Sequence, residues 1–314
     1  MKVGITCGGI GPYARGDFLR HSIQAAEAAG FAHYWMPDHV VQFAEYPQSS
    51  YPYAEGSGQD MPEQSADAPL QWNDDTYAMS DPRNAIIDPV IGMACLSGVT
   101  STIEIGSNIL VLPLRDPIVL AKAMATLDAF AGGRALLGVG VGWAKDEADA
   151  MGLDFSQRGR RTDEMIEAMR VLWCDEVSSY AGEIFRFEGA YCFPKPARAG
   201  GVPILIGGES KAAMRRVARL GDGWLPYDLP VEDASRVIAE LKEMTRGHGR
   251  DSENLRIIKI VYSNARLDDL KRYRDAGVTE FNVASSGEIP LDEPGIRAKF
   301  DEFRASIVEP IAAL

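Results

Sequence analysis

The sequence predicts a closed (β/α)8 barrel, the TIM-barrel fold, with insertions after the second and fourth strands. Its apolar pattern switches eight times between a short strand-like run and a longer amphipathic stretch. The strand-like runs are almost continuously apolar, as parallel strands covered on both faces should be. The length of 314 residues suits such a barrel, and no break in composition marks a linker. We therefore expect a single barrel domain over residues 1–314, with an open doubly wound sheet as the alternative.

The first half of the chain supplies four of the expected strand–helix units. The first helix has apolar residues at helical spacing and a glycine where it should end. The fourth helix is expected only after a connection at 143–157, and residues 40–86 lack periodicity and predict a long loop. The expected strands are 2–7, 33–38, 102–112 and 134–142, and the expected helices are 16–31, 88–100, 116–133 and 158–173.

The second half repeats the pattern after a small hairpin-like excursion at 183–196. A glycine again follows most of the helical stretches, where a helix commonly stops. The expected strands are 202–208, 222–228, 255–263 and 280–286, and the expected helices are 210–221, 231–249, 267–277 and 294–311.

Composition excludes several classes of function. The formal net charge is −13 and there is no dense basic stripe, which argues against nucleic acid and anionic membranes as partners. No apolar run approaches the ~20 residues that span a bilayer. The N-terminus lacks a cleavage pattern, so we expect a cytoplasmic protein. The four cysteines and four histidines have no metal-site spacing, and we expect no metal.

Active sites of (β/α)8 barrels lie at the carboxyl ends of the strands. The second expected strand is followed by Asp38 and His39. A histidine there can exchange a proton near neutral pH, and a neighbouring carboxylate can orient it. A histidine paired at the surface is the alternative. Ser107 and Asn108 interrupt the third strand, so their side chains face either a ligand or a neighbouring backbone.

The stretch "GVGVGW" at 138–143 resembles a dinucleotide-binding fingerprint. In that fingerprint the third glycine opens a helix, whereas Trp143 stands here. We interpret Gly138, Gly140 and Gly142 as the end of a barrel strand, where small residues let a flat or bulky group approach the backbone. Relief of crowding inside the barrel is the alternative.

The stretch "IGGES" predicts an anion site. Gly207 and Gly208 meet a helix N-terminus at Glu209 and Ser210, where backbone N–H groups and the helix dipole favour a phosphate. The carboxylate of Glu209 must then point away. An ordinary turn with a serine N-cap is the alternative. Trp224 follows on the next strand and could pack against an aromatic cofactor or belong to the core.

Two groups of arginines lie near helix starts. The first group could anchor an acidic cofactor tail or form a solvated face, and we favour the solvated face. The second group adds positive charge along the helix that follows the predicted anion site. The first group is Arg158, Arg160 and Arg161, and the second is Arg215, Arg216 and Arg219.

Together these segments resemble the luciferase-like flavin- and deazaflavin-dependent oxidoreductases. The resemblance covers most of residues 1–230, is specific in the central block, and is only a pattern in the C-terminal third. The matching stretches are "WMPDHV" (35–40), the block from "IEIGSN" to "ADAMG" (103–152), "RGRRTDEMIEAMRVLW" (158–173) and "VPILIGGESKAAMRRVARLGDGWLP" (202–226).

The resemblance implies a cofactor ring in the barrel mouth. It places Gly140, Gly142, Ser107 and Asn108 beside the ring and assigns the "GGES" amides to the phosphate. The Asp-His pair looks more like the deazaflavin branch, which favours coenzyme F420 over FMN. The resemblance thus implies hydride transfer between F420 and a small carbonyl, alcohol or activated alkene. His39 would exchange the proton and Asp38 would orient it.

The resemblance also implies a homodimer, and it exposes two departures. The tryptophan and the acidic residue that sugar-phosphate dehydrogenases of this branch carry are absent here, so a sugar phosphate is doubtful. The loop within 40–86 is longer than is usual, and its tyrosines and Trp72 suit a lid over a larger, partly apolar substrate. A dimer contact is the alternative for that loop.

Three other functions stay open. A monooxygenase using reduced FMN would activate oxygen and need a flavin reductase as partner. A non-catalytic barrel would bind a flavin-like ligand without turnover. A glycosidase needs two facing carboxylates, and no spacing among Asp38, Asp222 and Asp228 argues for such a pair.

Overall fold

Eight parallel strands close into a barrel, which confirms the predicted fold class. The computed structural model describes residues 1–49, 82–285 and 289–314. Around the barrel the order is β1-β2-β3-β5-β8-β9-β10-β11, with β1 paired to β11 and β3 paired to β5 to complete the closure. The barrel strands are β1 (Lys2–Thr6), β2 (His33–Met36), β3 (Glu104–Ser107), β5 (Ala135–Gly140), β8 (Ile204–Gly207), β9 (Gly223–Leu225), β10 (Arg256–Tyr262) and β11 (Glu280–Ala284).

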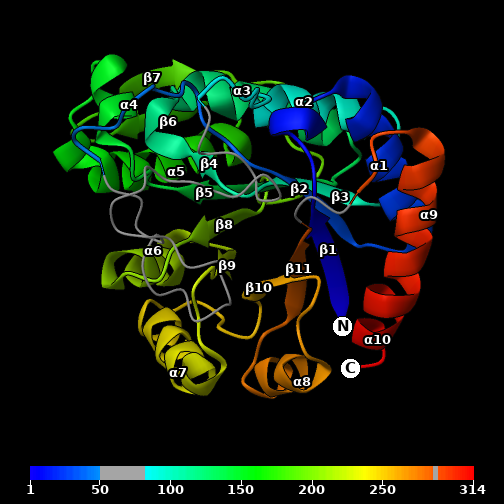
Figure 1. The fold of residues 1–314 in the computed structure, drawn as a ribbon. Helices are drawn as coiled ribbons and strands as arrows, with labels where there is room; N and C mark the ends of the chain where they lie inside the picture. Colours follow the sequence, from blue (N-terminus) through cyan, green and yellow to red (C-terminus); the bar gives the residue numbers. More distant parts are fainter. Residues whose placement is uncertain (50–81, 286–288) are drawn as a thin grey trace.

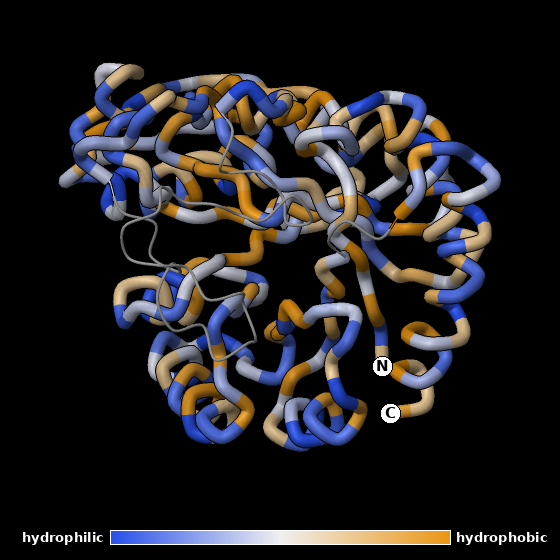
Figure 2. The backbone as a smooth tube through the Cα atoms, in the orientation of Figure 1, coloured by the Kyte–Doolittle hydropathy of each residue, from blue (hydrophilic) through white to orange (hydrophobic). Residues whose placement is uncertain are grey.

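Helices cover the outside of the barrel (Figure 1). Several begin at a side-chain cap: Asp88 and Asp116 each accept two backbone N–H groups at the starts of α2 and α3. In Figure 2 the helices alternate hydrophobic and hydrophilic segments, as one-sided burial requires. The covering helices are α1 (Gly16–Ala29), α2 (Pro89–Ser97), α3 (Pro117–Phe130), α5 (Arg158–Cys174), α6 (Lys211–Leu220), α7 (Val231–Gly247), α8 (Leu267–Asp275) and α9 (Glu293–Phe303).

Four predicted elements differ from the structure. The expected strand 102–112 splits into β3 and β4 (Leu110–Val111). The split occurs at Asn108, whose backbone N–H donates to the carbonyl of Met36, and β4 then pairs with the end of β5. The connection 143–157 contains the short helix α4 (Lys145–Ala150). The hairpin is β6 (Ser178–Ala181) and β7 (Arg186–Ala190), five residues before the expected start. The last helix passes through a π-helical turn at Arg304–Val308 into α10 (Glu309–Ala312).

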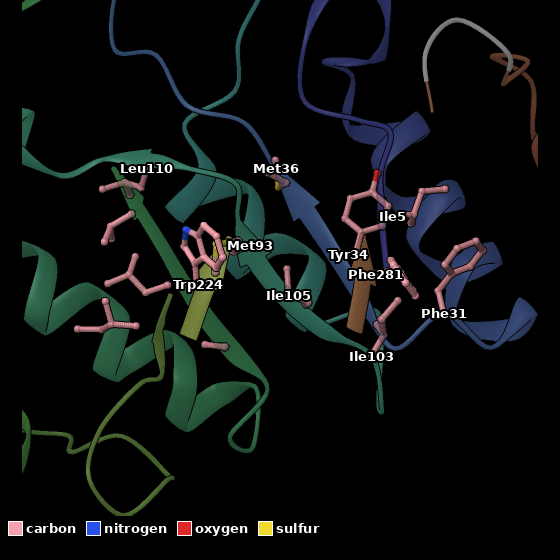
Figure 3. Close-up of a cluster of buried hydrophobic side chains, with 14 of the residues drawn as sticks. Ile5, Phe31, Tyr34, Met36, Met93, Ile103, Ile105, Leu110, Trp224 and Phe281 are labelled. Carbon is pink, nitrogen blue, oxygen red and sulfur yellow. The ribbon is translucent and has the colours of Figure 1, made fainter. Parts of the chain in front are cut away.

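Side chains alternate between two separate cores along each strand. The larger core lies between the strands and the helices, and Figure 3 shows part of it, including Trp224, Tyr34 and Phe281. The smaller core fills the inside of the barrel and consists of Trp35, Leu136, Leu205, Leu225 and Ile258, with Ile109 packed against it. The barrel is therefore filled, and ligands are confined to its mouth.

An ionic cluster lies inside the amino-terminal end of the barrel. Arg256 makes a two-point contact with Glu280, at 2.6 and 2.8 Å, and also bonds to Glu104. His33 contacts Glu280 at 3.1 Å through Nε2 and accepts the indole N–H of Trp35 at 2.6 Å through Nδ1. These contacts fix the neutral tautomer of His33, and burial lowers its pKa.

Candidate active site at the barrel mouth

His39 lies just beyond β2 at the carboxyl end of the barrel. Its Nδ1 is 3.1 Å from Oε2 of Glu147, which belongs to α4 and is almost wholly buried. The other oxygen, Oε1, accepts the amides of Val40 at 2.6 Å and Val41 at 3.2 Å. Because the Glu147 carboxylate accepts both of these amide protons, it also acts as an acceptor toward His39. Nδ1 of His39 therefore carries a proton and donates it to Glu147. Nε2 is then the nitrogen that can exchange a proton with a ligand.

Aromatic rings lie on one side of His39. The ring of Trp143 stands edge-on to the imidazole, with centroids 5.8 Å apart. Tyr46 packs against Trp143 at 5.2 Å, and Phe43 packs against Tyr46 at 5.8 Å. These rings give the imidazole an apolar flank, which favours proton exchange with an organic ligand over bulk water.

Asp38 does not orient His39, contrary to the sequence-based expectation. Its Oδ1 is 2.6 Å from the guanidinium of Arg115, and its Oδ2 accepts the amide of Val111 at 2.9 Å. Burial raises the pKa of this carboxyl, and the charge of Arg115 counters that effect. Arg115 also pairs with Asp88 at 2.7 Å. Asp38 therefore ties the loop after β2 to the segment after β3, and the carboxylate that contacts His39 is that of Glu147.

Ser107, the last residue of β3, and Asn108, which follows it, differ in their surroundings. Ser107 is fully buried, and its hydroxyl donates to the carbonyl of Gly138 at 2.8 Å. Its side chain is therefore a strand-to-strand tie, which was the alternative left open. Asn108 is partly exposed, and its backbone N–H donates to the backbone carbonyl of Met36 at 2.7 Å. Asn108 thus stays a candidate ring contact, and its peptide bond to Ile109 is cis.

The glycines of β5 allow close packing within the protein. A Cβ on Gly138 would lie 2.1 Å from the carbonyl oxygen of Ser107. A Cβ on Gly140 would lie 2.0 Å from Cδ1 of Ile109, and one on Gly142, which has a φ of +76°, would lie 2.6 Å from Val111. The side chain of Ile109 therefore occupies the space over Gly140 that we expected a cofactor to use, and only partly exposed Gly142 stays at the rim.

The start of α6 has the features of an anion site. Ser210 is the N-cap and accepts the amide of Ala213 at 3.1 Å, so the other first-turn amides lack helical partners. Lys211 is the first helical residue, and no acidic residue lies in the first turn. The Glu209 carboxylate is turned toward the loop after β9, where it accepts the amides of Tyr227 and Asp228. The chain enters this turn through Gly207 and Gly208. Gly208 has a φ of +98°, a left-handed conformation that favours glycine.

Trp224 is not a cofactor contact, which corrects the prediction. Its side chain has no exposed surface and lies in the core between strands and helices. Its indole N–H donates to the carbonyl of Gly208 at 2.9 Å. Trp224 thus supports the turn at the start of α6 from the core side.

Five of the six arginines near the helix starts bond to groups within the protein. Arg158 and Arg161 donate to backbone carbonyls, and Arg160 pairs with Glu183. Arg216 and Arg219 pair with Asp163. Among the described residues, no group of three or more histidines, cysteines or acids could hold a metal ion, and no described helix is long and apolar enough to cross a membrane.

Comparison with known proteins places this geometry in a family. A family model described as luciferase-like monooxygenase matches residues 69–276. The chain belongs to the luciferase-like monooxygenase family. Its relatives include an uncharacterized protein of Mycobacterium tuberculosis, strain H37Rv, 31% identical over 271 residues that cover 85% of this chain and 86% of the relative.

Two further similar proteins have names that state different cofactors. The FMNH(2)-dependent dimethylsulfone monooxygenase of Pseudomonas putida is 31% identical over 137 residues, which cover 43% of this chain and 38% of that protein. The solved structure of an F420-dependent secondary alcohol dehydrogenase with an F420-acetone adduct superposes with a TM-score of 0.72 at 17% identity, covering 99% of each chain. The chain is thus a luciferase-like oxidoreductase or monooxygenase of TIM-barrel fold.

Glu147 is the residue that sequence reasoning missed. It lies 108 positions from His39, in a segment expected to be a plain connection. The local signal was present: "KDEADA" is acidic and free of glycine and proline, as the first turn of a short helix can be.

Proposed function

We propose that this chain is an F420-dependent oxidoreductase that transfers a hydride between the deazaflavin and a small organic substrate. The substrate class is a carbonyl–alcohol pair or an activated carbon–carbon double bond. The observation that carries the proposal is the contact between His39 and Glu147 at the barrel mouth, because it leaves Nε2 as a proton-exchanging atom.

The start of α6 fits the phosphate of either cofactor. Its first-turn amides and Lys211 would hold the anion, and the carboxylate of Glu209 is turned toward other amides. Asn108, Gly142 and Trp143 are the partly exposed candidates for contact with the ring. When bound, F420 supplies or accepts the hydride, which is chemistry that no side chain provides.

The side chains of this protein handle the proton and the surroundings. Nε2 of His39 takes or gives the proton that accompanies hydride transfer, while Glu147 holds the tautomer and stabilises the charged imidazole. Trp143 and Tyr46 keep water away from one side of that nitrogen. The predicted lid within 40–86 lies mostly outside the described residues, and stays a prediction.

The second candidate is a monooxygenase that uses reduced FMN with a partner reductase. The relative from Pseudomonas putida, whose name states FMNH(2) dependence, favours it. The Asp38-His39 sequence, which looks like the deazaflavin branch, favours F420. A barrel that binds the cofactor without catalysis is the candidate from another class.

Titration of the purified apoprotein with F420 and with FMN separates these candidates. We expect tight binding of F420 and weak binding of FMN, followed by fluorescence at two salt concentrations. Tight binding of FMN alone, with oxygen consumed during turnover, would support the second candidate, the monooxygenase that uses reduced FMN. Binding without turnover over a broad panel of carbonyls and alcohols would favour the non-catalytic barrel.

The role of His39 has a direct test. We expect His39→Ala to bind F420 as the parent does but to lose ~10²–10⁴-fold in kcat/KM, the usual share of a proton-transferring side chain. Turnover equal to that of the parent would remove the proton role.

We also propose that the protein is a homodimer through α2 and α3. Ile91 on α2 and Val119 on α3 are 65% and 68% exposed, and Ile118 is 46% exposed, on adjacent helices. Light scattering should give twice the chain mass, and the pair Ile91→Glu and Val119→Glu should halve it. A monomeric parent protein would contradict this proposal.

A further inference from the structure

A threonine and an asparagine form a hydrogen-bonded pair inside the barrel. Thr6 is the last residue of β1, and Asn282 lies in the middle of β11, which pairs with β1 and lies beside it in Figure 1. The Nδ2 group of Asn282 donates to Oγ1 of Thr6 at 2.9 Å. The bond thus joins two neighbouring strands near the carboxyl end of the barrel.

Strand alternation directs both side chains into the barrel. Their neighbours along the strands, Ile5 on β1 and Phe281 and Val283 on β11, belong to the core between the strands and the helices. Thr6 and Asn282 therefore face inward. Asn282 has no exposed surface, whereas Thr6 is partly exposed. Because the inner core and the ionic cluster fill the barrel below, the exposed part of Thr6 faces the mouth.

The bond leaves the hydroxyl proton of Thr6 unused. A hydroxyl can donate one proton and accept at its lone pairs, and Asn282 uses a lone pair. Within the described parts of the chain, no acceptor takes the Thr6 proton, and no donor reaches the buried Oδ1 of Asn282. A buried polar atom without a partner is rare in native proteins and calls for an explanation. The pair therefore presents an unused donor to the mouth.

Thr6 lies away from the residues that we propose for the cofactor. Those residues follow β3, β5 and β8, which are consecutive in the barrel order, and β11 stands opposite the middle one. β1 is the neighbour of β2, and Thr6 is in register with Trp35, four residues before His39. Thr6 and His39 therefore border the part of the mouth that the cofactor residues leave for a substrate.

The chemistry of the pair suits an uncharged oxygen. A threonine hydroxyl and an asparagine amide carry no charge, so they offer a directed hydrogen bond without attracting an anion. A carbonyl oxygen can accept two hydrogen bonds, one from Thr6 and one from Nε2 of His39 when that nitrogen is protonated. A carbon–carbon double bond has no lone pair to offer. Thr6 thus distinguishes the two substrate classes of the proposed function.

We propose that Thr6 donates a hydrogen bond to the oxygen of a carbonyl or alcohol substrate, and that Asn282 positions the hydroxyl. The substrate class is then the carbonyl–alcohol pair and not the activated alkene. This inference rests on the proposed function for the hydride chemistry and for the role of His39. The observation that carries it is the inward-facing, partly exposed hydroxyl, held on its acceptor side by a buried amide.

The test compares probes that differ only at the oxygen. Straight-chain 2-alkanones of increasing length are paired with the 2-methyl-1-alkenes in which a CH₂ group replaces the carbonyl oxygen. Ligand-observed NMR gives both dissociation constants, for the apoprotein and for the protein with oxidised F420, which has no hydride to give to a ketone.

Four variants are compared with the parent. Thr6→Val removes the hydroxyl at nearly constant volume, and Thr6→Ser keeps it. Asn282→Leu removes the group that holds the hydroxyl. Thr126→Val is the matched control, because the hydroxyl of Thr126 donates to Lys122 within α3, outside the barrel.

The measured quantity is the affinity for the ketone divided by the affinity for the matched alkene. At the best chain length, we expect this ratio to be about tenfold lower in Thr6→Val than in the parent, the effect of one well-placed hydrogen bond. Thr6→Ser and Thr126→Val should keep the ratio of the parent, and Asn282→Leu should give an intermediate ratio. The affinity for F420 should be the same in all of them.

Three results overturn the inference: a Thr6→Val variant that keeps the ratio of the parent, a Thr6→Ser variant that loses it equally, or a parent that binds no 2-alkanone at any length. An unchanged ratio in Asn282→Leu would remove the positioning role of Asn282. Failure of both F420 and FMN to bind would instead overturn the proposed function. The ratio measured in the apoprotein would then still decide whether Thr6 contacts the oxygen.

Discussion

Glu147 holds His39 from a distance of 108 residues along the chain, with Oε2 of the carboxylate 3.1 Å from Nδ1 of the imidazole. The same carboxylate accepts the amides of the next two residues, Val40 and Val41. One side chain of α4 therefore fixes both the ring and the backbone that carries it. The proton exchange that we propose for His39 depends on this contact, because the contact determines which nitrogen is protonated.

Glu147→Gln should impair turnover more than folding. The glutamine oxygen can still accept the amides of Val40 and Val41, but its NH₂ group then faces Nδ1 and favours the opposite tautomer. We expect kcat/KM to fall ~10–100-fold with little change in cofactor affinity, as the loss of a residue that orients a catalytic histidine would predict. Steady-state kinetics across pH and cofactor titration measure the two effects.

Glu164→Gln is the matched control for that variant. Glu164 is also a buried glutamate, and it accepts the amides of Glu183, Ile184 and Phe185. It faces the hairpin and not His39. Equal losses of kcat/KM in the two variants would show that Glu147 contributes by supporting the fold and not by its contact with His39.

Asp38→Asn should destabilise the fold. Arg115 would keep its place in a partly buried site with only Asp88, and removing one partner of a buried pair costs about 3–5 kcal/mol. Asp38→Asn should therefore lower the midpoint of denaturant unfolding strongly. Asp17→Asn, which breaks an exposed and solvent-screened pair with Arg15, should leave that midpoint almost unchanged. Similar midpoints for the two variants would contradict the structural role of Asp38.

Local pattern predicted the barrel but not the partners of its polar residues. All eight strands appear near their expected positions, because alternation of strand and helix is a local property. Asp38 and His39 are neighbours in sequence, yet their side chains bond to Arg115 and Glu147 respectively. Such pairings depend on how distant loops meet at the mouth, which no local pattern contains.

The face of a buried strand is equally hidden from sequence. In "GWL" of β9, Leu225 faces the barrel interior and Trp224 faces the helices. Both faces of a barrel strand are apolar, so the periodicity that distinguishes inside from outside in a half-exposed strand is missing. Trp224 was therefore predicted at the cofactor although it packs in the outer core.

The two inward glycines of β5 should differ in their tolerance of alanine. Gly138→Ala places a methyl group against the backbone carbonyl of Ser107, which cannot move alone. Gly140→Ala meets only the end of the Ile109 side chain. We expect losses of more than about 3 kcal/mol for Gly138→Ala and about 1 kcal/mol for Gly140→Ala.

Combining Gly140→Ala with Ile109→Val removes the clashing Cδ1 and should restore stability measured by denaturant unfolding. Failure of this rescue, or equal losses for the two single variants, would contradict the packing described.

Glu280 should contribute to stability only above acidic pH. Burial opposes its ionisation, but the hydrogen bonds from His33 and Arg256 outweigh burial and lower its pKa from 4.5 to about 2. Its contribution is therefore fully present above pH 4.5 and is lost as pH falls toward 2, by about 3 kcal/mol in total.

Denaturant unfolding at a series of pH values should show Glu280→Gln less stable than the parent at pH 7, with the gap narrowing below pH 4.5. Glu183→Gln, at an exposed site, is the control variant and should differ little from the parent in stability at pH 7. A gap for Glu280→Gln that is independent of pH would contradict the lowered pKa.

Lys259 should also make stability rise with pH, but at alkaline pH and for a different reason. Burial lowers its pKa from 10.5 to about 8, with Glu209 and Asp228 partly countering the effect. Below pH 8 the ammonium is charged in both the folded and unfolded states, so the full cost of burying it is present. As pH rises from 8 to 10.5, the unfolded chain holds the proton that the folded chain has released, and stability rises by about 3 kcal/mol.

Lys259→Met should lack this rise, so its free energy of unfolding should fall relative to that of the parent between pH 8 and 10.5. Lys271→Met, which changes an exposed position, is the control variant measured across the same range. If the free energies of unfolding of the parent and of Lys259→Met change in parallel between pH 8 and 10.5, the pKa of Lys259 is not lowered. The ammonium that donates to the carbonyl of Tyr227 would then keep its charge over most of this range, because a lysine with a pKa of 10.5 loses its proton only near the top of it.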